Sequence, residues 1–253
     1  MASTLWAVSD LHVTFAANRE RVARLAGPQD WLIVAGDVAE KIPDVVAALK
    51  GLSERFAKVI WVPGNHELFN RRSDRINGKA RYRALVGELR ALGIITPEDE
   101  FPVFAGVIIC PLFTLYDYSF GPAALTVETA RMAMDDEIAI APYVDIRSWC
   151  AERVDYSRRR LEALNAPTIL INHWPLVEEP TARLRHPDLA LWCGTRATRD
   201  FPLRYRARCV IHGHLHAPAE QRVDGIPHID VSLGYPFETH HGSRPWPVPL
   251  LER

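Results

Sequence analysis

The chain has 253 residues and a formal net charge of −1; 48% of its residues are hydrophobic and 24% are charged. This length and composition are typical of one globular domain, which we expect to span residues 1–253. The balance of charge excludes a global basic field that would recruit nucleic acid or an anionic membrane.

The termini and the cysteines bear on where the protein works. The first residues lack the basic start of a signal peptide, and no apolar stretch is long enough to span a bilayer. The four cysteines form no Cys-x-x-Cys pair and are too sparse for a disulfide framework, which favours reduced thiols. We therefore expect a cytoplasmic protein that does not bind membranes.

Strand-like apolar runs alternate with helical periodicity along the first half of the chain. The pattern predicts strands at 5–8, 31–35 and 59–62, and helices near 18–25, 43–55 and 76–92. Further along it predicts a hairpin at 102–110, a helix at 147–164, strands at 168–171 and 209–211, and a terminal hairpin turning at Asp224-Gly225. This order indicates an α/β (α+β) fold, with a mixed sheet or two stacked sheets flanked by helices.

Two segments lack a regular pattern. Residues 112–146 hold one short helical stretch in an irregular sequence. Such an insertion beside a binding site often forms a lid or a substrate wall, and a surface excursion without a role is the alternative. The last dozen residues contain Pro245, Pro247 and Pro249, which predicts an extended tail over the surface.

Five short polar blocks follow apolar strand-like runs. They are Ser9–His12, Gly36-Asp37, Gly64–Glu67, Asn172-His173 and Gly213–His216. Four follow their run directly and one follows after a single proline. A strand that ends in a carboxylate or an imidazole is unusual for a core element. Five such endings indicate loops that converge on one point at the edge of a sheet.

The residue types in these blocks suit divalent metals. Residues i and i+2 of an extended chain face the same way, so Asp10 with His12, and His214 with His216, are expected to act as two-residue clamps. Carboxylates, imidazoles and one amide favour Mn²⁺, Fe or Zn²⁺ over Mg²⁺ or Ca²⁺. The candidate ligands are too many for one ion, and two ions that share Asp37 fit the set: Asp10, His12, Asp37, Asn65, His173, His214 and His216.

A two-metal centre predicts phosphate chemistry. Two ions about 3.5–4 Å apart activate a water and stabilise both oxygens of an in-line displacement. They bring more positive charge than Asp10, Asp37 and a bridging hydroxide return, so the surplus attracts a phosphate oxygen. The hydroxide would attack phosphorus. His66, beside the ligand Asn65, is left to face the substrate and donate a proton to the leaving oxygen.

The ordered blocks resemble a known superfamily. Asp-x-His, Gly-Asp-x-x-Glu, Gly-Asn-His-Glu, a single His after a strand and Gly-His-x-His are similar to the motifs of calcineurin-like metallophosphoesterases. The resemblance implies an αββα sandwich with the site at the strand ends and His66 as the catalytic histidine. It implies one ion held by Asp10, His12, Asp37 and His216, and another held by Asp37, Asn65, His173 and His214. Glu40 stands where many members have Asp.

A closer likeness concerns the substrate. Stretches at 30–37, 56–67, 115–120, 191–194 and 232–236 resemble a bacterial subgroup that includes a phosphopantetheinyl hydrolase acting on carrier proteins. The chain departs from that subgroup at residues 234–238, which read Gly-Tyr-Pro-Phe-Glu. The expected substrate is therefore a phosphate ester, either a small molecule or a phosphopantetheinylated carrier protein.

Other polar residues have plainer interpretations. His186, His228, His240 and His241 are expected to be hydrogen-bonded structural residues, and His212 a core residue or one that supports a ligand. Arg71 and Arg72 fit a solvated loop better than a phosphate site. The alternation of Arg204, Arg206 and Arg208 predicts one exposed strand face.

Three rival functions fit the sequence less well. A protein-binding scaffold of the same fold would usually have lost ligands, and here each ligand position is filled. A nuclease would need a basic groove, which is not evident, so nucleic acid is not an expected partner. A calcineurin-type protein phosphatase would show the motif Gly-Asp-x-His-Gly, which this chain lacks. We therefore expect a metal-dependent phosphodiesterase or phosphatase.

Overall fold

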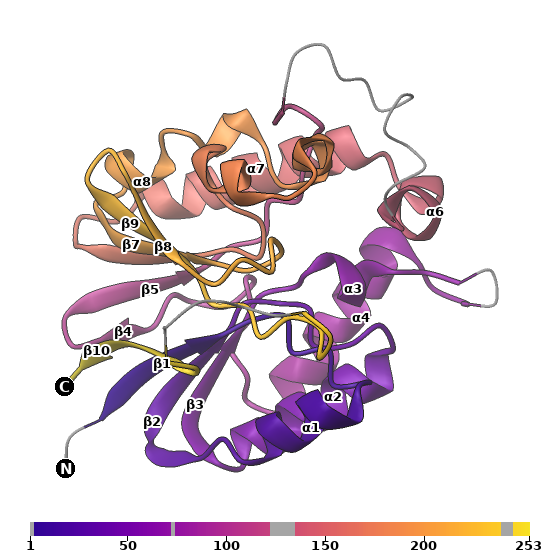
Figure 1. Cartoon of the computed structure of the whole chain (residues 1–253). Helices are drawn as coiled ribbons and strands as arrows, with labels where there is room; N and C mark the ends of the chain where they lie inside the picture. Colours follow the sequence, from indigo (N-terminus) through magenta and orange to yellow (C-terminus); the bar gives the residue numbers. More distant parts are fainter. Residues whose placement is uncertain (1–2, 72–73, 122–134, 239–244) are drawn as a thin grey trace.

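Two β-sheets pack face to face between two layers of helices (Figure 1). The structure is a computed structural model that describes residues 3–71, 74–121, 135–238 and 245–253. The first sheet has the order β10-β1-β2-β3 and the second has the order β4-β5-β6-β7-β9-β8. This arrangement confirms the expected αββα sandwich.

The first sheet is parallel except at one edge. Its parallel strands are β1 (Thr4–Val8), β2 (Gly27–Val34) and β3 (Phe56–Trp61). Helices α1 (Ala16–Ala23), α2 (Ile42–Ser53) and α4 (Gly78–Ala91) cover its outer face (Figure 1). These elements lie within a few residues of their predicted positions.

The second sheet has four parallel strands and an antiparallel strand at each edge. The parallel strands are β5 (Val107–Pro111), β6 (Thr168–Ile171), β7 (Ala207–His212) and β9 (Ile226–Asp230). The edges are β4 (Val103–Phe104) and β8 (Glu220–Val223). Helices α7 (Ile146–Glu162) and α8 (Phe201–Arg204) lie on its outer side (Figure 1).

Side-chain alternation along the strands divides the core into layers. Ile33, Ile169 and Ile211 point between the sheets, whereas their neighbours Leu32, Leu170 and Val210 point toward the helices. All are essentially inaccessible to solvent, and each contributes about 1.5–3 kcal/mol by burial.

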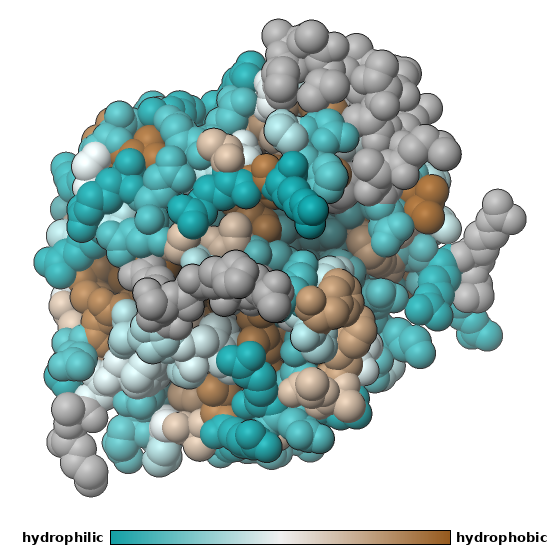
Figure 2. Space-filling view, viewed as in Figure 1, coloured by the Kyte–Doolittle hydropathy of each residue, from teal (hydrophilic) through white to brown (hydrophobic). Residues whose placement is uncertain are grey.

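The face of the molecule seen in Figure 2 is mostly hydrophilic, with apolar side chains in small separate patches.

Two predictions from the arginine and proline patterns need correction. The C-terminal residues are extended, as predicted, but they do not lie over the surface as a tail, because β10 (Val248–Glu252) pairs antiparallel with β1. β10 is an edge strand, and Pro249 is tolerated there because its missing N–H needs no partner on the open side. Arg204, Arg206 and Arg208 are exposed but share no strand face, since β7 begins only at Ala207 and Arg204 ends α8.

No helix among the described residues is both long and apolar enough to cross a membrane.

Candidate metal centre

The five polar blocks meet at one edge of the sandwich. They follow β1, β2, β3, β6 and β7, which are parallel within their sheets and so bring their carboxyl ends to one side. β1 and the stretch after β9 come together through a bridge between Ser9 and Ser232. The seven candidate ligands therefore come from both sheets and lie in one place.

The backbone reaches this arrangement differently from the prediction. Asp10, His12, Asp37, His214 and His216 all have positive φ, between 41° and 70°. They are thus in the left-handed region rather than in extended chain, which costs about 1–2 kcal/mol for each such residue. The period-two argument is therefore wrong in its geometry. These residues are aimed by sharp turns after the strands, and such strain is characteristic of functional sites.

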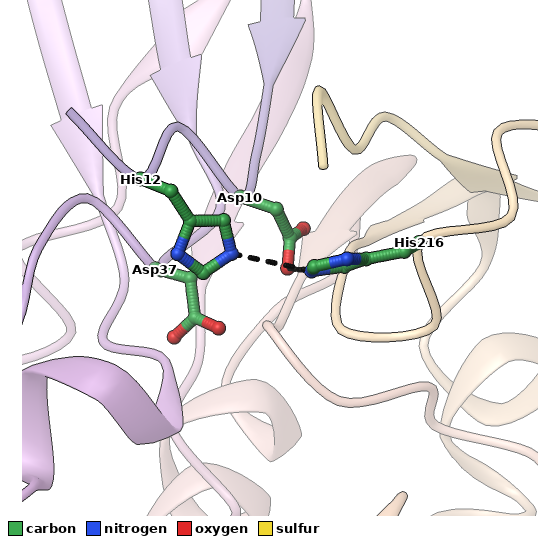
Figure 3. A group of neighbouring side chains, drawn as sticks. All are labelled: Asp10, His12, Asp37 and His216. Atoms are coloured by element: carbon green, nitrogen blue, oxygen red, sulfur yellow. Dashed lines mark hydrogen bonds and ion pairs between the residues drawn. The ribbon is translucent and has the colours of Figure 1, made fainter. Parts of the chain in front are cut away.

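One group of side chains contains Asp10, His12, Asp37 and His216, whose potential ligand atoms all lie within 4.8 Å of one another. Figure 3 shows the four side chains, carried by three separate loops, around a common space. Nε2 of His216 is 3.0 Å from Oδ1 of Asp10 and 3.2 Å from Nε2 of His12.

A second group shares Asp37 with the first and adds His173 and His214. Nε2 of His173 is 3.4 Å from Oδ2 of Asp37. The side-chain oxygen of Asn65 lies 3.2 Å from Nε2 of His173 and 3.0 Å from Nδ1 of His214. His214 and His216 thus belong to different groups, so the expected clamp of these two on one ion is wrong, whereas Asp10 and His12 do lie in the same group.

The donor sets fit divalent cations. Nδ1 of His216 lies 2.8 Å from Glu238, and Nδ1 of His173 lies 2.8 Å from the carbonyl oxygen of Ala35. Each ring therefore presents Nε2 to its group, which is the usual arrangement of a metal-binding histidine. The donor separations near 3 Å match those of neighbouring ligands on one ion at about 2.1 Å.

The charges of these residues also suit a cation. Burial raises the pKa of Asp10 and Asp37, but His216 and His173 respectively outweigh it, so both carboxylates stay ionised. Burial lowers the pKa of His12 to about 4 and that of His214 to about 3, which leaves neutral imidazoles. Only deprotonated ligands bind a metal ion. Burial opposes a charge on His173, yet the adjacent Asp37 raises its pKa to about 9, and a bound cation would displace that proton.

His66 stands beside the two groups at the wall of an open cavity of about 300 Å³. Its Nε2 is 3.9 Å from Oδ2 of Asp37 and 3.3 Å from the hydroxyl of Tyr235, and its Nδ1 is 3.8 Å from Glu40. Burial lowers the pKa of His66, but Asp37 and Glu40 raise it to about 9 overall. Phe69 and Leu184 also line the cavity.

Three supporting carboxylates were not assigned a role from the sequence. Glu67, buried to 1% exposure, accepts hydrogen bonds from the backbone N–H groups of Asp37, Val38 and Gly64. Asp136 accepts one from the Asn65 side chain, and Glu238 contacts His216. Glu67 lies inside a motif, which was a usable signal. Asp136 lies in the irregular segment 112–146, and Glu238 ends the stretch 234–238 in which the chain departs from the bacterial subgroup; neither position carried a signal for this role.

The histidines and arginines outside the two donor groups agree only in part with the structural roles expected of them. His212 is buried within β7, as expected. His228 is buried, but its ring nitrogens find no hydrogen-bond partner among the described residues, so the prediction of a hydrogen-bonded residue is wrong; burial lowers its pKa to about 3. His186 is exposed. Arg71 is not simply solvated, since it lies 3.2 Å from Glu40. Arg72, His240 and His241 fall outside the described residues.

Comparison with known proteins agrees with this geometry. Residues 3–218 match the model of the calcineurin-like phosphoesterase family. The chain is 44% identical over 255 residues to the [Acyl-carrier-protein] phosphodiesterase PptH of Mycobacterium tuberculosis, covering 93% of this chain and 79% of that protein. The crystal structure of phosphopantetheinyl hydrolase (PptH) from M. tuberculosis superposes with a TM-score of 0.92 at 43% identity, covering 98% of this chain and 96% of the other. The chain belongs to the calcineurin-like phosphoesterase family.

Proposed function

We propose that this protein uses two divalent metal ions to hydrolyse a phosphodiester, and that its substrate is a phosphopantetheinylated carrier protein. The observation that carries the proposal is the pair of donor groups that share Asp37, with His66 beside them in an open cavity. The family assignment confirms the broader class, a metal-dependent hydrolase of phosphoric esters. The relative from M. tuberculosis is an acyl-carrier-protein phosphodiesterase, which supports the finer assignment.

The ligand roles follow from the two groups. Asp10, His12 and His216 would hold one ion, Asn65, His173 and His214 would hold the other, and Asp37 would bind both. Mixed carboxylate and imidazole donors favour Mn²⁺ or Fe, with Zn²⁺ as a further choice. When bound, such ions lower the pKa of a water and stabilise negative charge on the phosphoryl oxygens.

His66 is placed to protonate the leaving group. In hydrolysis of the diester, a water oxygen forms a bond to phosphorus and the bond from phosphorus to the serine oxygen of the carrier protein breaks. That serine oxygen needs a proton as it departs. The carboxylates of Asp37 and Glu40 on either side of His66 favour its protonated form, so the ring can supply the proton and then recover one from solvent.

The segment 112–146 contributes to the wall of the cavity. Asp135 and Asp136 line it together with His66 and Phe69. This placement supports a substrate wall rather than a surface excursion without a role. Because the site draws ligands from both sheets, we also infer that residues 1–253 act as one domain.

The rim of the cavity supports a macromolecular substrate. Arg183 and Arg185 are exposed on either side of Leu184, which lines the cavity. Neither arginine forms an ion pair within the described part of the chain. By contrast, the nearby Arg196 pairs with Glu178 and Arg199 pairs with Glu179. We call Arg183 and Arg185 the cationic rim; two exposed positive charges that flank a cavity-lining residue in sequence favour an acidic partner surface.

The proposal is tested by incubating the purified protein with a phosphopantetheine-loaded carrier protein in Mn²⁺ and measuring the mass of the carrier. Loss of the prosthetic arm is expected. Hydrolysis of bis-p-nitrophenyl phosphate with no change in carrier mass would indicate a small-molecule diesterase. Turnover of p-nitrophenyl phosphate alone would indicate a phosphatase. Absence of both bound metal and turnover would favour a scaffold.

A further inference from the structure

Asp136 makes a contact that determines how a candidate ligand is oriented. It lies in α6 (Asp136–Ala139) and is fully buried. One of its carboxylate oxygens accepts a hydrogen bond of 3.0 Å from the side-chain nitrogen of Asn65. The amide oxygen of Asn65 consequently faces the other way, toward His173 and His214, at 3.2 and 3.0 Å.

The chemistry of the two side chains makes this orientation specific. An amide offers an acceptor oxygen and a donor nitrogen of almost equal size, so it fits its site either way round. An ionised carboxylate can only accept. Burial raises the pKa of Asp136 to about 7, and the charge of His66 opposes that rise, as a bound cation would. Asp136 therefore favours the orientation in which the Asn65 nitrogen faces it and the Asn65 oxygen faces the histidines. In the opposite orientation, an NH₂ group would point at the space that a cation must occupy.

α6 is held in place from both sides. The carbonyl oxygen of Ala139 accepts hydrogen bonds from the backbone and side-chain nitrogens of Asn70, at 2.8 and 3.1 Å. The carboxylate of Glu137 accepts hydrogen bonds from Tyr118 and from Trp192, at 2.8 and 3.0 Å. These bonds hold the helix to the segment just after the Gly-Asn-His-Glu block on one side and to loops of the second sheet on the other, so the position of Asp136 is well defined.

The cost of burying Asp136 also points to a role. The Tyr116 hydroxyl interacts with this carboxyl and lowers its pKa, but the second oxygen makes no well-formed hydrogen bond within the described residues. A buried carboxyl oxygen without a well-formed hydrogen bond is unfavourable by about 1–3 kcal/mol. A side chain that served only to stabilise the fold could be replaced by an apolar one at lower cost.

We propose that Asp136 is a positioning residue that holds the Asn65 amide with its oxygen toward His173 and His214, and so sets the affinity of that donor group for its metal ion. The inference rests on the assignment of Asn65 as a ligand under the proposed function. It makes segment 112–146 part of the metal centre, because the segment that walls the cavity also orients a ligand.

The test measures Mn²⁺ binding directly, by equilibrium dialysis and elemental analysis of the full chain. Asp136→Ala is expected to bind one ion normally and the other about 10- to 100-fold more weakly. Asp136→Asn keeps an acceptor oxygen but no longer excludes the flipped amide. Its affinity for the weakened ion should lie between those of Asp136→Ala and the wild type. Asp155→Asn removes the same charge from an exposed residue of α7 that does not line the cavity, and it should leave both affinities unchanged.

A reciprocal exchange separates positioning from general damage. Asn65→Asp alone places two carboxylates against each other and should weaken the second ion. Adding Asp136→Asn restores a donor–acceptor pair and should recover part of that affinity, as a double-mutant cycle detects. The thermal midpoint of each variant without metal reports any loss of folding.

Three results would overturn the proposal: wild-type affinity for both ions in Asp136→Ala, equal loss of both ions, or no recovery in the exchanged pair. These readouts do not depend on turnover. A wild type that binds two ions but cleaves no ester would reject the proposed function and leave the positioning role standing.

Discussion

The carboxylate of Asp37 accepts a hydrogen bond from the backbone N–H of His66, with 2.9 Å between the oxygen and the nitrogen. The other oxygen of the same carboxylate lies 3.4 Å from His173 and 3.9 Å from the His66 ring. The residue shared by both donor groups is therefore also the residue that fixes the backbone of the candidate acid. Metal binding and placement of the acid are coupled through one side chain.

The first prediction concerns His66. His66→Ala removes a proton donor but none of the seven candidate ligands, so it should retain its metals while kcat falls about 100- to 10,000-fold. The loss should be smaller for p-nitrophenyl esters, because p-nitrophenolate leaves without a proton, than for an alkyl ester such as the carrier-protein serine. Metal analysis and kcat on both substrates make the comparison.

The exposed His186 provides the control for this variant, and His186→Ala should keep both metal content and kcat. Release of metal from His66→Ala would mean that His66 is a ligand. An equal loss on both kinds of leaving group would remove the case for general-acid catalysis.

Gly64 leads to a second prediction. A Cβ at Gly64 would lie 2.7 Å from the backbone nitrogen of Asp37 and closer still to its carboxylate. Because that backbone cannot move without displacing the shared ligand, Gly64→Ala should weaken binding of both ions and reduce kcat/KM by at least about 100-fold.

Gly87 is the matched control for that change. It lies within α4, and a Cβ there meets no atom within 4 Å. Gly87→Ala should leave metal binding unchanged and raise the free energy of unfolding by about 0.5–1 kcal/mol, since alanine favours the helix. Normal metal content in Gly64→Ala would show that the loop relaxes more easily than its contacts suggest.

The strands and the candidate ligands could be predicted because both depend on local signals, whereas the αββα sandwich was implied by the resemblance to a known superfamily. Asp10, Asp37 and His173 each come within a few residues of the end of an apolar run, and such endings are visible in one dimension. The direction of the side chains was not visible, since it depends on left-handed turns at residues such as His12 and His214. Non-glycine residues enter that region only when the surrounding structure compels them.

The supporting residues could not be predicted, for a related reason. Asp136 reaches Asn65 across 71 positions of sequence, and a short helical stretch in an irregular segment does not show which part of the fold it contacts. β10 escaped detection because Pro249 within it, with Pro245 and Pro247 just before it, argues against a strand, and only its place at the edge makes Pro249 harmless. Both facts depend on tertiary packing.

A third prediction concerns pH and lies away from the metal centre. Oε1 of Glu98 is 2.7 Å from an Arg153 nitrogen and 2.6 Å from the Tyr82 hydroxyl. Burial raises the pKa of Glu98, but Arg153 and Tyr82 outweigh it and hold the pKa below its usual value. Glu98 therefore stabilises the fold fully above the unfolded pKa of about 4.3, and this stabilisation is lost as the pH falls through the folded pKa.

Glu98→Gln should accordingly lower the free energy of unfolding by about 2 kcal/mol at pH 7, with a gap to the wild type that closes below about pH 4.3. Urea unfolding from pH 7 to 3.5 measures the gap. Glu88→Gln, at an exposed position on α4, should show almost no gap at any pH. A gap for Glu98→Gln that stays constant into acid would rule out the ionised pair as its cause.

The fourth prediction concerns the cationic rim. If Arg183 and Arg185 guide an acidic carrier protein to the cavity, the double change Arg183→Glu with Arg185→Glu should raise KM for the loaded carrier about tenfold or more at low salt, with kcat little changed. The effect should shrink as salt rises, because exposed charges are screened over about 10 Å at 0.1 M. Bis-p-nitrophenyl phosphate is too small to reach the rim. Its kcat/KM should therefore stay within about twofold of the wild-type value, because surface substitutions usually have small effects.

A matched double change distinguishes the rim from net charge. Arg159 on α7 and Arg208 near the start of β7 are also exposed. The candidate site lies at the other end of β7. Converting both to glutamate alters the total charge equally and should leave KM for the carrier almost unchanged. Equal rises in KM for the two double variants would assign the effect to long-range charge. A loss of activity on the small diester in the rim variant would show instead that these arginines support the catalytic cavity itself.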